Sequence, residues 1–427
     1  NTWGGDSSSV SSSIGSGVVE IFSTNYAFAA LKSNGLVVTW GEPGAGGDSS
    51  SVSSSLSSGV VEIFSTNAAF AALKSDGSVV TWGTGSDEDY GGDSSSVSSS
   101  LSSGVVEIFS TSMSFAALKS DGSVVTWGLG QYGGDSSSVS SSLSSGIIEI
   151  YSTNFAFAAL KSDGSVVTWG NGYWGGDSSS VATELSTGIV EIFPAMNAFA
   201  ALKSDGSVVT WGDIYFGGDS SSVSSSISSE VVEIFSTQRA FAALKSDGSV
   251  VTWGENTWGG DSSSVSSSLT SGVVEIYSTD RAFAALKNDG SVVTWGTSNY
   301  GGDSSLVSTS ISSGIIEIFS SDAIFAALDS DGANVPADGT PCDDGDSSTT
   351  GDVYVNGVCQ GTQSNSPPVV SGLSFDSTSS GVKTHTTHNC LFTVSDADGD
   401  AVTTTINWYA DGVQIGTGAT ITLTPSI

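Results

Sequence analysis

Hydrophobic residues along this chain occur in short runs that recur at a fixed interval. The segment Val-Val-Glu-Ile-Phe appears eight times with minor changes, and its glutamates are Glu20, Glu62, Glu107, Glu149, Glu191, Glu233, Glu275 and Glu317. Successive copies lie 42 residues apart, with one longer step between Glu62 and Glu107. Such a period is typical of a solenoid or a propeller, in which a repeat needs neighbours to bury its faces. One repeat is therefore not a domain by itself.

Each repeat predicts three strands and a short polar element. In one copy the strands cover 60–66, 70–75 and 78–83, and the polar element covers 91–104. An Asp-Gly or Asn-Gly pair separates the second and third strands in every copy, which predicts a type I′ hairpin turn with positive φ at both residues. The polar element has Val97 and Leu101 four residues apart, so it is either a weak outer strand or a single helical turn.

The strands lack a regular alternation of apolar and polar residues, which indicates that both faces of each sheet are buried. Small sheets stacked around an axis have this property, and the repeat length is that of a propeller blade. We therefore expect an all-β fold with a β-propeller of eight short blades; seven blades and an open β-solenoid are the alternatives. The chain starts midway through a repeat and the last repeat loses its Trp-Gly strand, so we expect a ring to close between them.

The segment Phe-Ala-Ala-Leu-Lys-Ser-Asp-Gly-Ser-Val-Val-Thr-Trp-Gly, as at 70–83, resembles the repeat of the regulator of chromosome condensation family. The resemblance covers residues 1–336 and implies a β-propeller. It departs from the family pattern because Gly-Gly-Asp-Ser replaces the family's Gly-Gln-Leu-Gly and because the repeats are shorter. The resemblance implies nothing about nucleotide exchange in this chain, since fold alone does not carry function.

Charge and composition exclude several classes of function. The chain has 44 acidic and 10 basic residues and a net charge of −34, which argues against binding to nucleic acid or to anionic membranes. No apolar stretch is long enough to predict a membrane span. Three Cys and two His offer little for metal or nucleophilic chemistry, so we expect a non-enzymatic protein without a cofactor.

The repeats differ from one another mainly in two loops, one after the first strand and one between Trp-Gly and Gly-Gly-Asp. In an antiparallel sheet of this order the two loops lie at the same end, so we expect them to form one contact surface. The alternative is that exposed turns simply vary. The candidate contact residues are Tyr26, Asp87, Glu88, Asp89, Met113, Phe155, Trp174, Phe216, Arg239 and Arg281.

One lysine recurs in seven of the repeats, at the end of the second strand, for example Lys74 and Lys119. We expect it to be the charge partner of the glutamate on the adjacent strand, a pair worth about 0 to 1 kcal/mol when exposed.

The composition changes after Val335, and the repeat stops. Residues 340–362 resemble a small Cys-rich segment of secreted bacterial proteins that normally has four Cys, with Ser348 and Tyr354 in the places of the inner two. The resemblance implies a disulfide between Cys342 and Cys359 and an oxidising, extracellular setting. Reduced thiols are the alternative. We assign 1–336 to the propeller, 337–368 to this disulfide-stapled linker and 369–427 to a further domain.

Residues from 369 onwards resemble the start of a bacterial immunoglobulin-like β-sandwich, with Cys390 and Trp408 among the matching positions. Only part of such a domain is present, and the resemblance implies that the partner of Cys390 lies outside this chain. Either the chain is a fragment, or a neighbouring subunit supplies the missing strand.

Three aspartates in this part have the alternate spacing of oxygen ligands for Ca²⁺: Asp396, Asp398 and Asp400. Asp343, Asp344 and Asp346 are a weaker second set, and a tight polar turn explains either set equally well. A zinc site at His385, His388 and Cys390 is less favoured, because the resemblance makes Cys390 half of a disulfide.

Taken together, these features predict a secreted, non-catalytic structural or adhesive protein of the cell surface, a subunit of an extracellular filament or matrix. Its partners would be further copies of itself, other surface proteins or glycans. The alternative is a monomeric receptor module that binds carbohydrate or protein.

Overall fold

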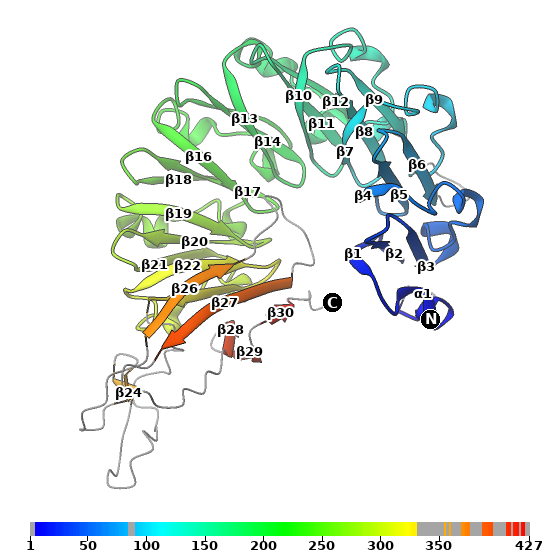
Figure 1. Ribbon diagram of the computed structural model, residues 1–427. Helices are drawn as coiled ribbons and strands as arrows, with labels where there is room; N and C mark the ends of the chain where they lie inside the picture. Colours follow the sequence, from blue (N-terminus) through cyan, green and yellow to red (C-terminus); the bar gives the residue numbers. More distant parts are fainter. Residues whose placement is uncertain are drawn as a thin grey trace, which may run out of the picture. The chain divides into compact units, whose positions relative to one another are not determined.

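The computed structural model describes residues 5–83 and 90–330, together with short strands between 354 and 422. Its contacts divide the chain into two compact units, Asn1–Ser229 and Glu230–Ile427. Both units are all-β, and the repeats within them form antiparallel sheets that follow one another in chain order (Figure 1). The predicted all-β class and the three-stranded repeats are therefore confirmed.

Seven repeats form three-stranded sheets, and the eighth has two strands within the described residues. The first strands are β1 (Val18–Ser23), β4 (Val60–Ser65), β7 (Val105–Ser110), β10 (Ile147–Ser152), β13 (Ile189–Pro194), β16 (Val231–Ser236), β19 (Val273–Ser278) and β22 (Ile315–Ser320). The second strands are β2 (Ala27–Lys32), β5 (Ala69–Lys74), β8 (Ser114–Lys119), β11 (Ala156–Lys161), β14 (Ala198–Lys203), β17 (Ala240–Lys245), β20 (Ala282–Lys287) and β23 (Phe325–Asp329). The third strands are β3 (Val37–Gly41), β6 (Val79–Gly83), β9 (Val124–Gly128), β12 (Val166–Gly170), β15 (Val208–Gly212), β18 (Val250–Gly254) and β21 (Val292–Gly296).

The hydrophobic core lies between successive sheets. Ala116 and Leu118 of one sheet form a buried cluster with Ile150, Phe157 and Trp169 of the next. Phe157 and Trp169 are cross-strand partners whose stacked rings are 5.1 Å apart. The middle strand is buried on both faces because a neighbouring sheet covers each of them, which explains why its sequence does not alternate.

In five repeats the tryptophan of the third strand also joins its sheet to the preceding repeat. The indole Nε1–H of Trp169 donates to the carbonyl of Gly133, 3.0 Å away, in the loop that follows β9. Gly133 has a φ of 106°, and a Cβ on it would lie 2.5 Å from the ring of Phe157. Only glycine fits this close approach, and this is the physical reason for the first glycine of each Gly-Gly-Asp segment.

The hairpin between the second and third strands is not the predicted type I′ turn. Gly77 has a φ of 76°, whereas Glu230 is the sole non-glycine residue with positive φ in the described part of the chain. The Gly77 N–H donates to the Lys74 carbonyl, and the Lys74 N–H donates to the Ser78 carbonyl. This is a type I turn followed by a left-handed glycine in a three-residue loop. Asp76 favours it because its Oδ1 accepts from the N–H and hydroxyl of Ser78.

The polar fourth element is a 3-10 turn rather than an outer strand. Asp135 Oδ1 accepts from the Ser137 N–H at the start of one such turn, and Leu143, four residues after its end, is buried. The Ser140 hydroxyl donates to the Ser137 carbonyl, so the segment satisfies part of its own backbone. These turns are η1 (Ser8–Val10), η3 (Ser50–Val52), η4 (Ser95–Val97), η6 (Ser137–Val139), η8 (Ser179–Val181), η11 (Ser221–Val223), η13 (Ser263–Ser268) and η15 (Ser305–Val307).

Two further helical pieces accompany these turns, α1 (Ser11–Ile14) and η9 (Glu184–Ser186). A second set of 3-10 turns follows the third strands: η2 (Pro43–Ala45), η5 (Gly130–Tyr132), η7 (Gly172–Trp174), η10 (Ile214–Phe216), η12 (Asn256–Trp258) and η14 (Ser298–Tyr300).

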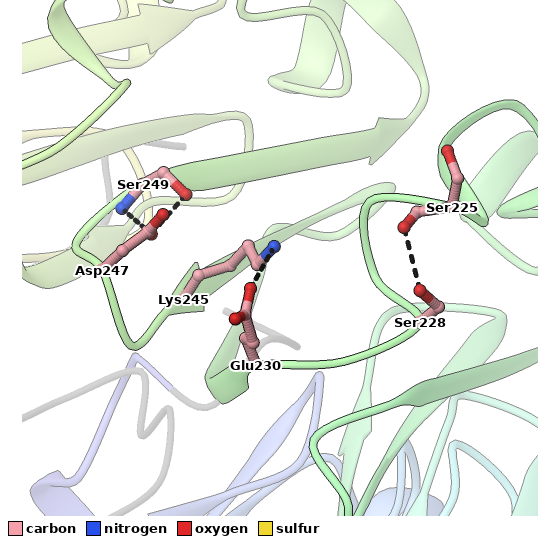
Figure 2. A network of polar contacts seen from close by, with 6 residues as sticks. All are labelled: Ser225, Ser228, Glu230, Lys245, Asp247 and Ser249. Carbon is pink, nitrogen blue, oxygen red and sulfur yellow. Dashed lines mark hydrogen bonds and ion pairs between the residues drawn. The ribbon is translucent and has the colours of Figure 1, made fainter.

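The recurring lysine does not have the partner that we expected. The Nζ of Lys119 donates to the Ser100 carbonyl at 2.8 Å, so the ammonium caps the serine-rich turn instead of pairing with the strand glutamate. Lys245 instead forms an ion pair with Glu230, with Nζ and Oε2 3.2 Å apart (Figure 2). Glu230 occupies the position held by glycine in the other repeats, with a φ of 68°.

In the C-terminal part, the described strands are β24 (Tyr354–Val355), β25 (Val358–Cys359), β26 (Val369–Phe375), β27 (Thr387–Ser395), β28 (Asn407–Ala410), β29 (Val413–Thr417) and β30 (Thr420–Thr422). Antiparallel pairing joins β24 with β25, β26 with β27, β27 with β30 and β28 with β29. An immunoglobulin-like sandwich, closure of a ring and the three-domain division stay predictions.

Candidate contact surface

The two variable loops of a repeat are hydrogen-bonded to each other in the six repeats for which the structure describes both loops in full. In one repeat the Asn171 N–H, after the third strand, donates to the Phe155 carbonyl, after the first strand, at 2.9 Å. Thr153 joins the same loops, because its buried hydroxyl donates to the Trp174 carbonyl and accepts from the Ala156 N–H. We call the surface formed by these paired loops the variable rim. The Thr of each Ser-Thr pair is thus the residue that holds the rim together.

Three of the aromatic rim residues of the first unit pack against one another. The ring of Phe155 lies 4.9 Å from that of Tyr132 and 4.3 Å from that of Trp174. Tyr132 comes from the preceding repeat and Trp174 from the same repeat as Phe155. The rim residue after a first strand is therefore held between the aromatic residues of two successive repeats.

The second unit has the same arrangement with arginine in place of phenylalanine. The guanidinium of Arg239 lies 4.3 Å from the centre of the Trp258 ring, and that of Arg281 lies 4.1 Å from it. Arg281 also lies 4.4 Å from the ring of Tyr300. These distances are those of cation–π interactions, each worth about 0.5 to 2 kcal/mol. The two arginines in the chain are thus both held against the same tryptophan ring of the rim.

A half-buried carboxylate accompanies this stack. Burial and the charge of Asp322 raise the pKa of Asp280, whereas a hydrogen bond from Gln238 and the charge of Arg281 lower it, with a net upward shift. The Gln238 N–H donates to the Asp280 carbonyl, and the Asp280 N–H donates to the Asp322 carbonyl. Backbone hydrogen bonds therefore link the rim of each repeat in the second unit to that of the next.

The structure places the remaining predicted rim residues separately. Tyr26 is exposed, and Met113 and Phe216 are half-buried. Asp87, Glu88 and Asp89 lie outside the described residues.

The most exposed aromatic side chains of the rim, Tyr173 and Tyr215, are not among the contact residues that the sequence predicted. Tyr173 is 87% exposed and Tyr215 is 68% exposed, each in the middle of a 3-10 turn. Asn171 Oδ1 and Asp213 Oδ1 accept from their backbone N–H groups and so fix both turns. Each tyrosine directly precedes a predicted residue, Trp174 or Phe216. In the sequence, each site is a pair of adjacent aromatic residues, Tyr173-Trp174 or Tyr215-Phe216. The first residue of the pair faces solvent, and the second is half-buried.

The metal and disulfide predictions fall largely outside the described part of the chain. Asp396, Asp398, Asp400 and Cys342 are outside it, as are the side chains of Cys359 and Cys390. Among the described side chains, no group of three or more His, Cys, Asp and Glu could hold a metal ion. None of the helices in the described residues is long and apolar enough to cross a membrane.

Comparisons with known proteins find similarity in structure only. No protein-family model and no curated protein matches the chain. Among solved structures, it is similar to the computationally designed Ika8 protein, with 14% identity over 73% of this chain and 93% of that chain and a TM-score of 0.31.

Two natural proteins have similarly low TM-scores and sequence identities. Yeast RCC1 (Prp20), in a complex with Kap60, has 16% identity over 56% of this chain and 70% of that chain, with a TM-score of 0.35. The ectodomain of the Physcomitrella patens receptor kinase CR4 has 13% identity over 65% of this chain and 71% of that chain, with a TM-score of 0.33. Similarities this weak decide nothing about a ligand or a partner.

Proposed function

We propose that this chain is a secreted, non-catalytic structural or adhesive protein of the cell surface, a subunit of an extracellular filament or matrix, and that the variable rim is its contact surface. The observation that carries the proposal is the placement of the variable residues. They gather in paired loops, where Thr153 and its equivalents hold them on a rigid sheet scaffold. Recognition residues are commonly placed on loops that a rigid scaffold positions.

The rim has the chemistry of a binding surface more than of a catalytic one. Its exposed members Tyr173 and Tyr215 offer flat, amphipathic rings, and Trp258 lies between two guanidinium groups. Aromatic and arginine side chains are the types enriched at protein interfaces. The extracellular setting is supported by the resemblance around Cys342 and Cys359. A free-thiol titration of the denatured protein tests it, because a Cys342–Cys359 disulfide leaves at most one of the three Cys as a free thiol.

Electron microscopy of the full chain at rising concentration tests the structural role. The proposal expects long polymers from the wild type and their loss in a variant that carries Tyr173→Ser, Tyr215→Ser and Arg281→Ala. Leu306 is as exposed as Tyr173 and lies in a serine-rich turn that is not part of the paired variable loops, so Leu306→Ser is the matched control and should polymerise normally. Dispersed particles from the wild type, or polymers from the rim variant, would contradict the proposal.

A monomeric carbohydrate-binding receptor module is the second candidate, and the two exposed tyrosines favour it. Phenol rings can stack on the apolar face of a sugar while their hydroxyls remain in water. This role expects saturable binding to particular members of a glycan array by a protein that remains monomeric, with that binding lost in Tyr173→Ser and Tyr215→Ser.

A further inference from the structure

A row of exposed aliphatic side chains runs along the first strands, away from the variable loops. Val106 is 53% exposed and Ile148 is 55% exposed, and Val61 and Val190 occupy the same position in neighbouring repeats of the first unit. The second unit has Val232, Val274 and Ile316 at this position. Every repeat therefore keeps a β-branched apolar residue where half of the side chain faces solvent.

Strand pairing within the sheet does not require an aliphatic residue at this position. Val105 pairs with Lys119 and Glu107 pairs with Leu118, so Val106 is the extra, unpaired residue of a β-bulge. Its side chain has no cross-strand partner on the sheet. The other exposed positions of the repeat are mostly Ser, Asp and Gly, so a polar residue would be expected here as well. Bulges are known to re-aim a side chain, and this one aims an aliphatic group outward.

Hydrogen bonds join successive first strands of the first unit beside the variable loops, at the end of each strand opposite to its exposed aliphatic residue. At the ends of these strands the Ser112 N–H donates to the Asn154 carbonyl at 2.8 Å, and the Asn154 N–H donates to the Met196 carbonyl at 2.9 Å. The Ser152 hydroxyl donates to the Ser110 carbonyl at 2.8 Å. The first strands of the first unit therefore lie side by side, and each carries its exposed aliphatic residue at the same position, the second of the strand.

A line of carboxylates accompanies this row. Burial, followed by the charges of Glu62 and Glu149, raises the pKa of Glu107, and burial and Glu149 raise that of Glu191. Each of these glutamates directly follows an exposed aliphatic residue in sequence. The glutamates of neighbouring repeats are thus close enough to repel one another, and a cation placed among them would relieve that repulsion.

We propose that the exposed valines and isoleucines of the first unit, with the glutamates next to them, form a surface, here called the first-strand surface. This surface binds an elongated segment of another protein that carries aliphatic side chains on one side and Lys or Arg on the other. The aliphatic row buries the apolar side of that segment. The glutamates pair with its basic residues, and such charge complementarity gives specificity and register. A second copy of this chain is a poor occupant, because it brings the same negative charge.

Binding of two labelled synthetic peptides to the full chain tests the proposal. The peptides have equal length and charge, and one alternates Lys with Leu whereas the other alternates Lys with Ser. The wild type should bind the Lys/Leu peptide about tenfold more tightly. A variant carrying Val106→Thr, Ile148→Thr and Val190→Thr should lose that preference, because threonine keeps the β-branched shape and the charge but makes the row polar. Leu306→Thr should keep the preference.

Two further measurements separate the alternatives. A variant carrying Val106→Ile and Val190→Ile should bind the Lys/Leu peptide with a larger preference than the wild type. The urea midpoint of the threonine variant should be unchanged, which shows that its sheets are intact. Equal affinity for both peptides in the wild type, or a preference that survives in the threonine variant, would overturn the proposal. Dimers that are lost in the threonine variant would overturn it in favour of a second copy. The rim residues are unchanged in all of these variants, so the outcome is independent of the proposed function.

Discussion

Replacing Gly133 with alanine tests how tightly neighbouring repeats are joined. The added Cβ would lie 2.5 Å from Phe157 Cδ2 and 2.6 Å from Cε2, far inside van der Waals contact. The φ of 106° is also unfavourable for any residue with a Cβ. Overpacking costs about 1 to 3 kcal/mol and backbone strain about 1 to 2 kcal/mol. The unfolded chain has less conformational entropy with alanine than with glycine, and this offsets about 0.5 kcal/mol of the loss of stability. We therefore expect Gly133→Ala to lower the free energy of unfolding by about 2 to 4 kcal/mol.

Gly130→Ala is the matched control, three residues away in the same loop. Its Cβ would make an ordinary contact of 3.4 Å with the Asp135 side chain. The φ of Gly130 is not positive, so alanine can adopt the native backbone there. The control should change the free energy of unfolding by about 0.5 kcal/mol or less.

Urea unfolding followed by tryptophan fluorescence measures both variants, and a loss of about 2 kcal/mol lowers the midpoint by about 1 M. Hydrogen exchange of the Trp169 indole N–H adds a local measurement, because this group donates to the Gly133 carbonyl. The exchange should be faster in Gly133→Ala and unchanged in Gly130→Ala. Equal midpoints for the two variants would refute the view that close contact between repeats explains the first glycine of Gly-Gly-Asp.

Three other predictions concern charge. Glu230→Ala should cost about 1 kcal/mol, because it removes the partly exposed ion pair with Lys245. Glu230→Gly should be about 1 to 2 kcal/mol more stable than the alanine variant, because glycine relieves the positive φ, and equal urea midpoints for the two variants would contradict this. As pH falls from neutral, the free energy of unfolding should first rise. The pKa of Glu107 is raised in the folded state, so its protonation removes the cost of a half-buried carboxylate that neighbouring glutamates repel. This rise should be smaller in Glu107→Gln. Further acid should lower stability, because serine hydrogen bonds depress the pKa values of the turn aspartates below 3.8 and that contribution is lost as pH falls through the lower values; a urea midpoint that does not change with pH would contradict both steps. A double-mutant cycle of Trp258→Ala and Arg281→Ala should give a coupling energy of about 0.5 to 2 kcal/mol, and additive effects would show that the ring and the guanidinium do not interact.

Much of the fold follows from the repeat itself. The fixed period, the β-branched runs and the Asp-Gly pairs predicted three antiparallel strands in each copy, and the order of those strands predicted that both variable loops share one end of the sheet. The turn type was wrong because Asp76 accepts from both the N–H and the hydroxyl of Ser78, and this favours a type I turn with a single left-handed glycine. The partner of the lysine was wrong because the nearest acceptor for its ammonium is a backbone carbonyl, such as that of Ser100 for Lys119.

The sequence by itself determined the strand content, the length of the repeat and the places where the copies differ, because these depend on local patterns that are read along the chain. Only the tertiary structure decided what each variable residue contacts, since its neighbours come from other repeats. Phe155 is held between Tyr132 and Trp174, whereas Tyr173, next to one of them in sequence, faces solvent. The exposure of the aliphatic residues was likewise decided in three dimensions, because a bulge turns Val106 outward although it directly follows the buried Val105 in the same strand.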